Sequence, residues 1–417
     1  MCKVRDGYKM TEIGEIPEEW QAVKLGHICT VKSSKRVYQS DYIESGIPFY
    51  RSKEIIELSK GVEPSIELYI SEEMYSEYER KFGVPQKNDL FISSVGTIGK
   101  TWVSDGRKFY YKDGNITQVM ANDKINTYYL SYLFETTVLK KQYMNQSSGS
   151  AQIALTIEKL NKLMIPLPPL FEQQKIADIL STVDQQIKQT DALIEKTKEL
   201  KKGLMQRLLT KGIGHTEFKD TEIGRIPKEW EVKTLAECAV FINGRAFKPS
   251  EWKEKGIPII RIQNLNGSND FNYFDGEIDS KYFVNKGQLL FSWSGSRGTS
   301  FGPHFWLGDR GVLNQHIFKV EIADGIDKQY FYYALKKITE DIEKEAHGSA
   351  GLVHITKAKL EKFKIPVPDI SEQMKIGQIL FENDICIKRY KQKFENLLSL
   401  KKTLMQKLLT GSIRVNI

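Results

Sequence analysis

The sequence predicts an α+β protein built as a tandem duplication, in which two globular modules alternate with two long helices. Two observations lead to this prediction. Blocks from the first half of the 417-residue chain recur about 200 positions later, a spacing that suits a domain plus a connector and is too long for a solenoid repeat. Each copy also combines short β-branched and aromatic runs with one long stretch of helical periodicity.

The repeated blocks mark where each copy begins and ends. Residues 11–20 recur as residues 221–230 with eight of ten positions identical. Residues 165–210 recur as residues 365–410 without a gap, and 22 of these 46 positions are identical. The duplication therefore covers a whole module together with the segment that follows it.

The two copies have diverged unevenly. The offset between matching residues is 210 at Trp20 and Trp230 but 199 at Leu90 and Leu289, so the second copy is 210 − 199 = 11 residues shorter between these points. The modules therefore share a scaffold and differ in a surface segment, which indicates that their tasks are not identical.

Each module is expected to contain sheet and shorter helices. Runs of β-branched and aromatic residues between Gly, Pro, Asn and Ser turns predict strands at residues 90–93, 109–111, 257–262 and 289–293. Helical spacing predicts shorter helices at residues 128–141 and 328–345.

A long helix is expected to follow each module. Proline-rich segments at residues 166–169 and 366–368 precede it, and the first stretch runs from Glu172 to Leu209 with no proline and one glycine, Gly203. Apolar residues follow the 4-3 register of a coiled-coil seam. In the first stretch the seam residues are Ile176, Leu180, Val183, Ile187, Ile194, Leu204 and Leu208. In the second they are Ile376, Leu380, Ile387, Phe394, Leu397, Leu404 and Leu408, with Tyr390 on the same register.

Two seams of equal length in one chain can pair as an antiparallel coiled coil, which would relate the two copies by a pseudo-two-fold axis. The alternative is that each helix is an independent amphipathic helix packed on its own module. The coiled-coil interpretation divides the chain into a first module at residues 1–165, a spacer helix at 166–211, a second module at 212–365 and a second spacer helix at 366–417.

Composition and charge limit the functional class. Aromatic residues make up 11% of the chain, which argues against a disordered scaffold, and no apolar run approaches the roughly 18 residues of a membrane span. The net charge of 61 − 53 = +8 favours a polyanionic partner. The N-terminus resembles no secretory signal, and four dispersed cysteines, Cys2, Cys29, Cys238 and Cys386, suit a reducing cytoplasm.

The motifs of common enzymes are missing from the sequence. The six histidines form no HExxH or other ligand spacing, and there is neither a GxxxxGK[ST] phosphate loop nor a GxGxxG after a strand. Asp369 with Glu372 and Lys375 loosely imitates a nuclease site, but the ExxK spacing at a helix start favours a helix N-terminal signal. Gly96 and Gly99 could cradle phosphate, although a β-turn explains them better. We therefore expect no catalytic residue and no metal site.

Polar side chains in turns instead suggest a nucleic-acid surface. Arg, Asn and Gln can read base edges bidentately, while Lys and Ser mostly hold phosphate. Each cluster alone could be a solvated turn, but clusters recur at matching points of both copies, with Asn115 and Asn314 as the best single pair. The first-module candidates are Lys35, Arg36, Tyr50, Arg51, Ser94, Thr97, Lys100, Asn115 and Gln118. The second-module candidates are Asn243, Arg245, Lys248, Arg261, Gln263, Asn264, Ser296, Arg297, Asn314 and Gln315.

Several of these motifs together resemble the specificity (S) subunits of type I restriction-modification systems. The resemblance covers essentially the whole chain and rests on the duplicated Ile-Gly-x-Ile-Pro-x-Glu-Trp block, on Gly-Ile-Pro at residues 46–48 and 256–258, and on Asp89 to Ser93 followed by Gly96 and Gly99. Its most specific part is Ile-Pro-x-Pro followed by Glu-Gln and the long helix, in both copies. The second copy departs at Gln288, which replaces the aspartate, and at Ser296 to Gly298, so sequence readout there is expected to differ.

The resemblance implies two target-recognition domains, each reading one half of a split, asymmetric double-stranded DNA site, with the helices setting the spacer. It further implies a non-catalytic chain without cofactors of its own. Two methyltransferase (M) subunits using S-adenosylmethionine would dock on it, and restriction (R) subunits using ATP and magnesium would join through them. The alternatives are a specificity subunit for a fused nuclease-methyltransferase and, from another class, a coiled-coil assembly protein without DNA binding.

Overall fold

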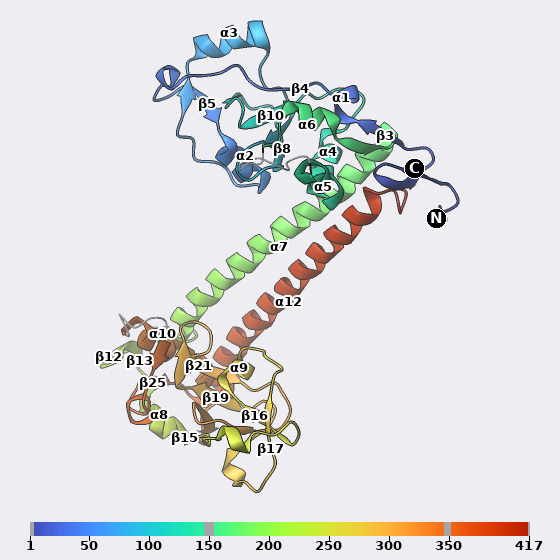
Figure 1. Cartoon of the computed structure of the whole chain (residues 1–417). Helices are drawn as coiled ribbons and strands as arrows, with labels where there is room; N and C mark the ends of the chain where they lie inside the picture. The colour runs from blue at the N-terminus through green and yellow to red at the C-terminus, as the bar shows by residue number, and fades with distance from the viewer. Residues whose placement is uncertain (1–3, 146–153, 346–351, 416–417) are drawn as a thin grey trace. The chain divides into compact units, whose positions relative to one another are not determined.

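The structure is a computed structural model that describes residues 4–145, 154–345 and 352–415 (Figure 1). The chain forms two compact units, and the second unit interrupts the first in sequence. The first unit comprises residues 1–190 and 393–417, and the second comprises residues 191–392. Both units mix sheets and helices, which confirms the predicted α+β class.

The first unit is built around a four-stranded antiparallel sheet in the order β4-β10-β7-β8. Its strands are β4 (Val31–Lys32), β10 (Ile116–Val119), β7 (Leu90–Ser93) and β8 (Thr101–Val103). A second sheet holds β6 (Tyr69–Ile70), β5 (Ile47–Tyr50) and β9 (Tyr110–Tyr111), and smaller pairs are β1 (Tyr8–Thr11) with β2 (Gly14–Pro17) and β3 (Gln21–Lys24) with β11 (Met164–Leu167). Its helices are α1 (Leu25–Ile28), α2 (Ser52–Ser59), α3 (Glu72–Phe82), α4 (Thr127–Glu135), α5 (Thr137–Asn145) and α6 (Ile157–Lys162).

The second unit repeats this plan with the sheet β15-β23-β19-β21. These strands are β15 (Ala239–Asn243), β23 (Ile317–Ile322), β19 (Leu289–Ser292) and β21 (Gly302–Phe305). The second sheet holds β17 (Asn272–Phe274), β16 (Ile257–Ile260), β22 (Gly311–Leu313) and β18 (Phe283–Val284). Smaller pairs are β12 (Phe218–Thr221) with β13 (Gly224–Pro227), β14 (Glu231–Thr234) with β25 (Lys364–Val367), and β20 (Ser294–Ser296) with β24 (Leu352–His354). Its helices are α8 (Leu235–Cys238), α9 (Ile262–Leu265), α10 (Lys328–Glu345) and α11 (Lys357–Leu360).

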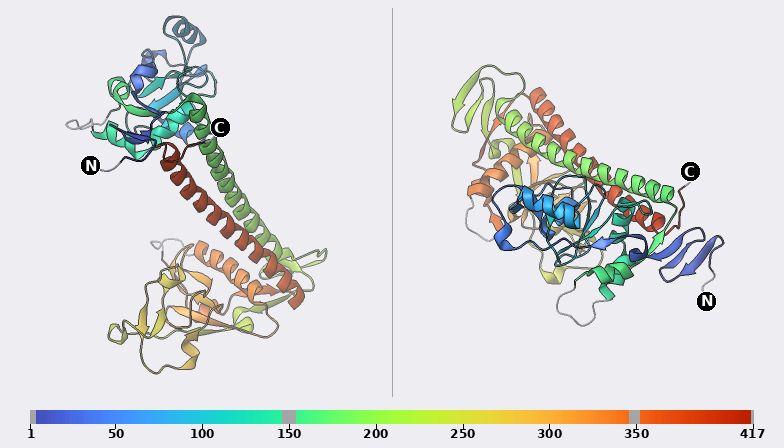
Figure 2. Two further views of the ribbon diagram at one scale, coloured as in Figure 1. Left: turned by 90° about the vertical axis from the view of Figure 1, so that its right-hand side faces the viewer. Right: turned by 90° about the horizontal axis from the view of Figure 1, so that it is seen from above.

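Two long helices belong to both units, α7 (Leu170–Lys211) and α12 (Ile370–Leu408). Within each unit a stretch of α7 lies beside a stretch of α12, as the further views also show (Figure 2). In the first unit Ile176 and Leu180 near the start of α7 share one apolar core with Leu408 and Leu409 at the end of α12. In the second unit Ile376 and Leu380 share a core with Leu208 and Leu209. The helices therefore run antiparallel within each unit, which confirms that the two seams pair.

The two most strongly repeated sequence motifs join each module to its helix. The indole Nε1 of Trp20 donates to Glu172 Oε2 at 2.9 Å, and that of Trp230 donates to Glu372 Oε2 at 2.9 Å. Both tryptophans are buried, and both glutamates stand in the first turn of a long helix, where the helix dipole favours a negative charge. Glu372 is thus part of a structural joint, which agrees with the helix-start interpretation.

A segment from the other repeat completes each joint. The guanidinium of Arg414, which follows α12, donates to Glu172 from Nε at 2.7 Å and from Nη2 at 3.0 Å. His215, which follows α7, lies with its Nε2 atom 2.9 Å from Glu372 Oε2. Each unit is therefore closed by residues that come directly after the partner repeat's helix.

Candidate nucleic-acid interface

In the first unit three loops meet at one edge of the sheets. They follow β4 (residues 33–41), β5 (Arg51 and the start of α2) and β9 (residues 112–115). Because β5 and β9 are parallel, their carboxyl ends lie at the same edge. Backbone contacts tie the loops together: Lys112 N donates to the carbonyl of Tyr50 at 2.8 Å, and Ser34 Oγ donates to the carbonyl of Tyr111 at 2.6 Å.

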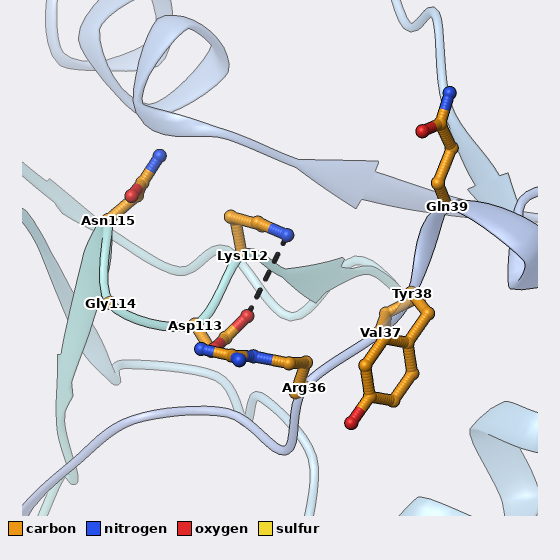
Figure 3. A pocket seen from close by; sticks show the side chains of 8 residues that line it. All are labelled: Arg36, Val37, Tyr38, Gln39, Lys112, Asp113, Gly114 and Asn115. Atoms are coloured by element: carbon orange, nitrogen blue, oxygen red, sulfur yellow. Dashed lines mark hydrogen bonds and ion pairs between the residues drawn. The ribbon is translucent and has the colours of Figure 1, made fainter.

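These loops line a polar pocket of about 430 Å³ (Figure 3). Its walls are Arg36, Val37, Tyr38, Gln39, Lys112, Asp113, Gly114 and Asn115. Arg36 Nε donates to Asp113 Oδ2 at 2.8 Å, and this contact raises the pKa of the Arg36 guanidinium. The Tyr38 side chain is largely exposed, while Asn115 and Gln39 extend away from the ion pair (Figure 3). The pocket therefore offers both donors and acceptors, the set that reads base edges.

A buried tyrosine, Tyr110, anchors one of the loops that line this pocket. Burial raises the pKa of Tyr110 to about 12, so its hydroxyl stays protonated near neutral pH. The hydroxyl oxygen accepts a hydrogen bond from the backbone N–H of Lys35 at 2.9 Å. This hydrogen bond ties the loop that carries Lys35 and Arg36 to a buried core residue, while both of these side chains are exposed.

The second unit forms the corresponding edge from the ends of β15, β16 and β22. Arg245 N donates to the carbonyl of Leu313 at 2.8 Å, and Asn314 N donates to the carbonyl of Ile260 at 3.0 Å. Arg261 follows β16 directly, so Arg245, Arg261 and Asn314 belong to three loops at one edge. These three residues were expected from the sequence to belong to one surface, and the fold brings their backbones together.

Most of the nineteen predicted DNA-binding residues have accessible side chains. Nine are exposed: Lys35, Arg36, Thr97, Lys100, Asn243, Lys248, Gln263, Ser296 and Arg297. Six are partly buried: Arg51, Asn115, Arg245, Arg261, Asn314 and Gln315. Four of the exposed residues lie outside the three loops: Thr97 and Lys100 follow β7, Ser296 ends β20, and Arg297 follows it.

Four predicted surface residues lie inside the modules instead. Tyr50 is 2% exposed and stacks on Phe109, because it belongs to the last position of a buried strand. The Ser94 hydroxyl pairs with that of Thr117 at 2.8 Å, and Gln118 Nε2 donates to Asp89.

The fourth internal residue, Asn264, is 6% exposed and accepts a hydrogen bond from the backbone N–H of Arg261 at 2.9 Å. These four polar side chains therefore pack against or form hydrogen bonds with other residues of the protein. The sequence pattern alone could not distinguish this internal role from a role at the surface.

Strand pairing also corrects the match between Asn115 and Asn314. Lys112 N bonds to the carbonyl of the residue that ends β5, and Asn314 N bonds to the carbonyl of the residue that ends β16. Asn314 therefore corresponds to Lys112 and not to Asn115. The offset of 199 hid this because the second unit has three more residues between the end of β19 and the end of β22 (313 − 292 = 21) than the first unit has between the end of β7 and the end of β9 (111 − 93 = 18).

The sequence analysis missed several residues of these sites. They are Tyr38, Gln39, Lys112 and Asp113, which line the first-unit pocket. For Lys112 and Asp113 the available signal was their position directly after the strand predicted at residues 109–111, since carboxyl ends of neighbouring parallel strands meet at one edge. Tyr38 and Gln39 follow no predicted strand. Among the described residues no group of three or more His, Cys, Asp or Glu side chains is arranged to hold a metal ion. Across the same residues, no helix is long and apolar enough to cross a membrane.

The duplicated α+β fold with its shared long helices defines a class of protein in which two divergent modules are carried on one helical scaffold. The model of the type I restriction modification DNA specificity domain matches the chain twice, at residues 17–199 and 227–398. These matches cover more than half of the chain, and the protein belongs to this family of type I restriction-modification specificity subunits.

Similar proteins support this assignment over the whole length. The putative type I restriction enzyme MjaX specificity subunit of Methanocaldococcus jannaschii is 31% identical over 98% of this chain and 97% of its own. The MjaVIII specificity subunit of the same organism is 29% identical over 96% and 94%. The crystal structure of a type I restriction-modification S subunit from M. genitalium shares the fold, with a TM-score of 0.59 at 19% identity and 98% coverage of both chains.

Proposed function

We propose that this chain is the DNA-reading subunit of a type I restriction-modification complex and that each module recognises one half of a bipartite, asymmetric site. The observation that carries this proposal is the duplicated edge: three loops meet at the same place in both units, and the side chains on these loops differ. A common scaffold with different reading residues is what two unlike half-sites require.

The long helices would set the distance between the half-sites and dock the methyltransferase subunits. Supporting this, α7 has 42 residues and α12 has 39, and a continuous helix has a fixed rise of about 1.5 Å per residue. In this proposal the chain has no catalytic role of its own. S-adenosylmethionine would bind to the methyltransferase subunits, ATP and magnesium would act with the restriction subunits, and the complex would work in the cytoplasm.

The experiment is to express the full chain with its methyltransferase subunit in a host without other modification systems and to sequence methylated bases in single DNA molecules. The proposal expects one split motif with two different halves and a fixed spacer. Absence of methylation without this chain is the matched control. A symmetric or continuous motif, or an unchanged motif when this chain is omitted, would contradict the proposal.

A further inference from the structure

The second-unit edge carries buried polar atoms that make no hydrogen bond to any of the described residues. Of the seven buried side-chain atoms in the described structure that make no hydrogen bond, four lie on the loops that follow β15, β16 and β22. They are Arg245 Nη1, Arg261 Nε, Gln315 Oε1 and His316 Nδ1. Folded proteins leave few buried polar atoms unpaired, and several at one edge indicate that an outside partner completes them.

The chemistry of these four atoms defines that partner. Arg245 Nη1 and Arg261 Nε are donors, each on its own planar guanidinium group. Gln315 Oε1 is an acceptor, and His316 Nδ1 donates or accepts according to its tautomer. The Arg261 guanidinium lies over the Trp252 ring at 5.5 Å, which steadies its plane without using its N–H groups. Planar, bidentate donors of this kind match the O6 and N7 acceptors of guanine in the major groove.

The corresponding arginine of the first unit, Arg51, is already bound by two carboxylates of the protein. Arg51 Nη2 donates to Glu54 Oε1 at 2.7 Å and to Glu67 Oε2 at 2.9 Å. These contacts, with Glu54 the stronger, raise the pKa of the guanidinium above its ordinary value. Glu54 is 1% exposed, so this pair is built into the start of α2.

Two differences between the repeats explain why Arg51 is paired with carboxylates and Arg261 is not. Both arginines donate their backbone N–H three residues ahead, Arg51 to Glu54 Oε2 at 2.7 Å and Arg261 to Asn264 Oδ1 at 2.9 Å. Asn264 performs the same capping role without a negative charge, and its Nδ2 is used on the carbonyls of Ser268 and Asp270. Glu67 lies in the segment for which the second copy is shorter. Among the residues that the structure describes, no carboxylate therefore bonds to Arg261.

We propose that Arg261 is a specificity-determining residue that reads a guanine in the second half-site, while Arg51 is a structural residue that reads no base. This inference rests on the DNA recognition proposed above. It makes the two modules unequal at equivalent positions: the second reads with the arginine after β16, and the first reads with the pocket residues around Asn115.

The test uses the full chain with its methyltransferase subunit and the methylated motif as the readout. Arg261→Lys keeps the charge and the aliphatic stem but loses the bidentate fork, and Asn264→Glu restores the carboxylate that occupies Arg51. Both variants should relax the same guanine position in one half-site, with roughly a 10- to 100-fold loss of discrimination, and leave the other half unchanged. Arg225→Lys, on an exposed hairpin of the same unit, is the matched control and should keep the full motif.

Arg51→Lys is the opposing arm and should leave both half-sites intact. An unchanged motif with Arg261→Lys, or relaxation of a half-site by Arg51→Lys, would overturn the inference. Uniform weakening at all sites with Arg261→Lys would also overturn it, because that outcome assigns the residue to a phosphate. A wild-type chain that directs no split motif would instead refute the proposed function itself, so the two failures are distinguishable. Unfolding temperatures of all variants show whether a lost motif reflects a lost fold.

Discussion

At the scale of single residues, the buried glutamates Glu172 and Glu372 show how a duplicated joint tolerates divergence. Each accepts a hydrogen bond from a tryptophan N–H at 2.9 Å. The second partner differs, because Glu172 is also bound by Arg414 and Glu372 by His215. A carboxylate out of water needs such donors, because an unsatisfied buried charge is costly. The second donor therefore comes from the same place in both units, the segment after a long helix, although it is an arginine in one unit and a histidine in the other.

Replacing Arg414 with alanine should therefore destabilise the first unit. Glu172 would keep the Trp20 indole but lose its cationic partner, and we expect the free energy of unfolding to fall by about 1–3 kcal/mol. Urea unfolding measures this difference. Arg225→Ala, which removes an exposed arginine, should change the unfolding free energy by no more than about 0.5 kcal/mol. Equal effects of the two substitutions would show that the contact between Arg414 and Glu172 adds nothing to stability.

The buried thiols should be unreactive in the native protein. Burial raises the pKa of Cys29 and of Cys238 to about 11 from an ordinary 9.0, so the thiolate fraction at pH 8 falls about 100-fold. Alkylation by iodoacetamide at pH 8, followed by mass spectrometry, should label neither site until the protein is denatured, and labelling should rise as the pH approaches 11. Rapid native labelling of either thiol at pH 8 would contradict the assigned burial.

At the scale of elements, the long helices contain a feature that the apolar periodicity did not predict. Lys201 on α7 pairs with Asp384 on α12, and Asp384 also accepts the hydroxyl hydrogen of Tyr333 at 2.7 Å. In the other unit Lys401 Nζ lies 2.9 Å from Asp184 Oδ1, and the hydroxyl of Tyr132 donates to Asp184 Oδ2 at 2.8 Å. Ion pairs at two seam positions fix the register, as polar residues in coiled coils do.

A charge exchange should reveal this coupling. Lys201→Asp would place two carboxylates together and reduce the free energy of unfolding by about 1–3 kcal/mol. Adding Asp384→Lys should recover at least half of the loss, giving a coupling energy of about 1–2 kcal/mol in a double-mutant cycle measured by urea unfolding. Lys198→Asp, at an exposed position one turn away, should change little. Additive effects of the two exchanges would exclude a role in register.

Lengthening both helices should lengthen the DNA spacer. A heptad inserted after Thr190 in α7 and another after Tyr390 in α12 would leave the ion pairs on either side intact, and would add about 10 Å of helix. The methylated motif should keep both halves and gain spacer base pairs. A heptad in α7 alone cannot satisfy both ion pairs and should abolish methylation. An unchanged spacer after the paired insertion would show that the helices do not measure DNA.

The sequence analysis predicted the duplication, the long helices and their pairing because these depend on local periodicity and internal repetition. It could not give the strand order, which depends on pairings between residues far apart in sequence. It also expected one helix over residues 128–141, where the structure has α4 and α5. Thr136 separates them because its hydroxyl donates to the carbonyl of Leu133 and accepts from the N–H of Leu139, a local alternative to continued helix.

At the scale of the whole molecule, α7 is complementary to itself. It carries both Asp184 and Lys201, which in the full chain pair with Lys401 and Asp384, the matching residues of α12. Two antiparallel copies of α7 could therefore form an Asp184–Lys201 ion pair twice, once in each direction, with the same apolar seam on each side.

A fragment of residues 1–216 should consequently form a two-fold symmetric dimer. Without a partner its seam would expose an apolar stripe that soluble monomers rarely tolerate. With the methyltransferase subunit, the dimer should methylate a palindrome with a spacer close to that of the full chain. Light scattering gives the mass, and sequencing of methylated bases gives the motif. A monomeric fragment, or a dimer with an asymmetric motif, would show that the seams are not interchangeable.

The closure of the first unit by the end of the chain has a consequence for synthesis on the ribosome. Tyr8 Oη donates to the carbonyl of Gly411 at 2.8 Å, and Arg414 donates to Glu172, so this unit lacks part of its core until the segment of residues 404–415 has been translated. The second unit spans residues 191–392 without interruption and has all its parts earlier. Vectorial folding usually favours the N-terminal domain, but here the order of completion is reversed. We therefore expect the first unit to complete its fold only after the second unit has been synthesised, because Arg414 must be present before it can bind Glu172.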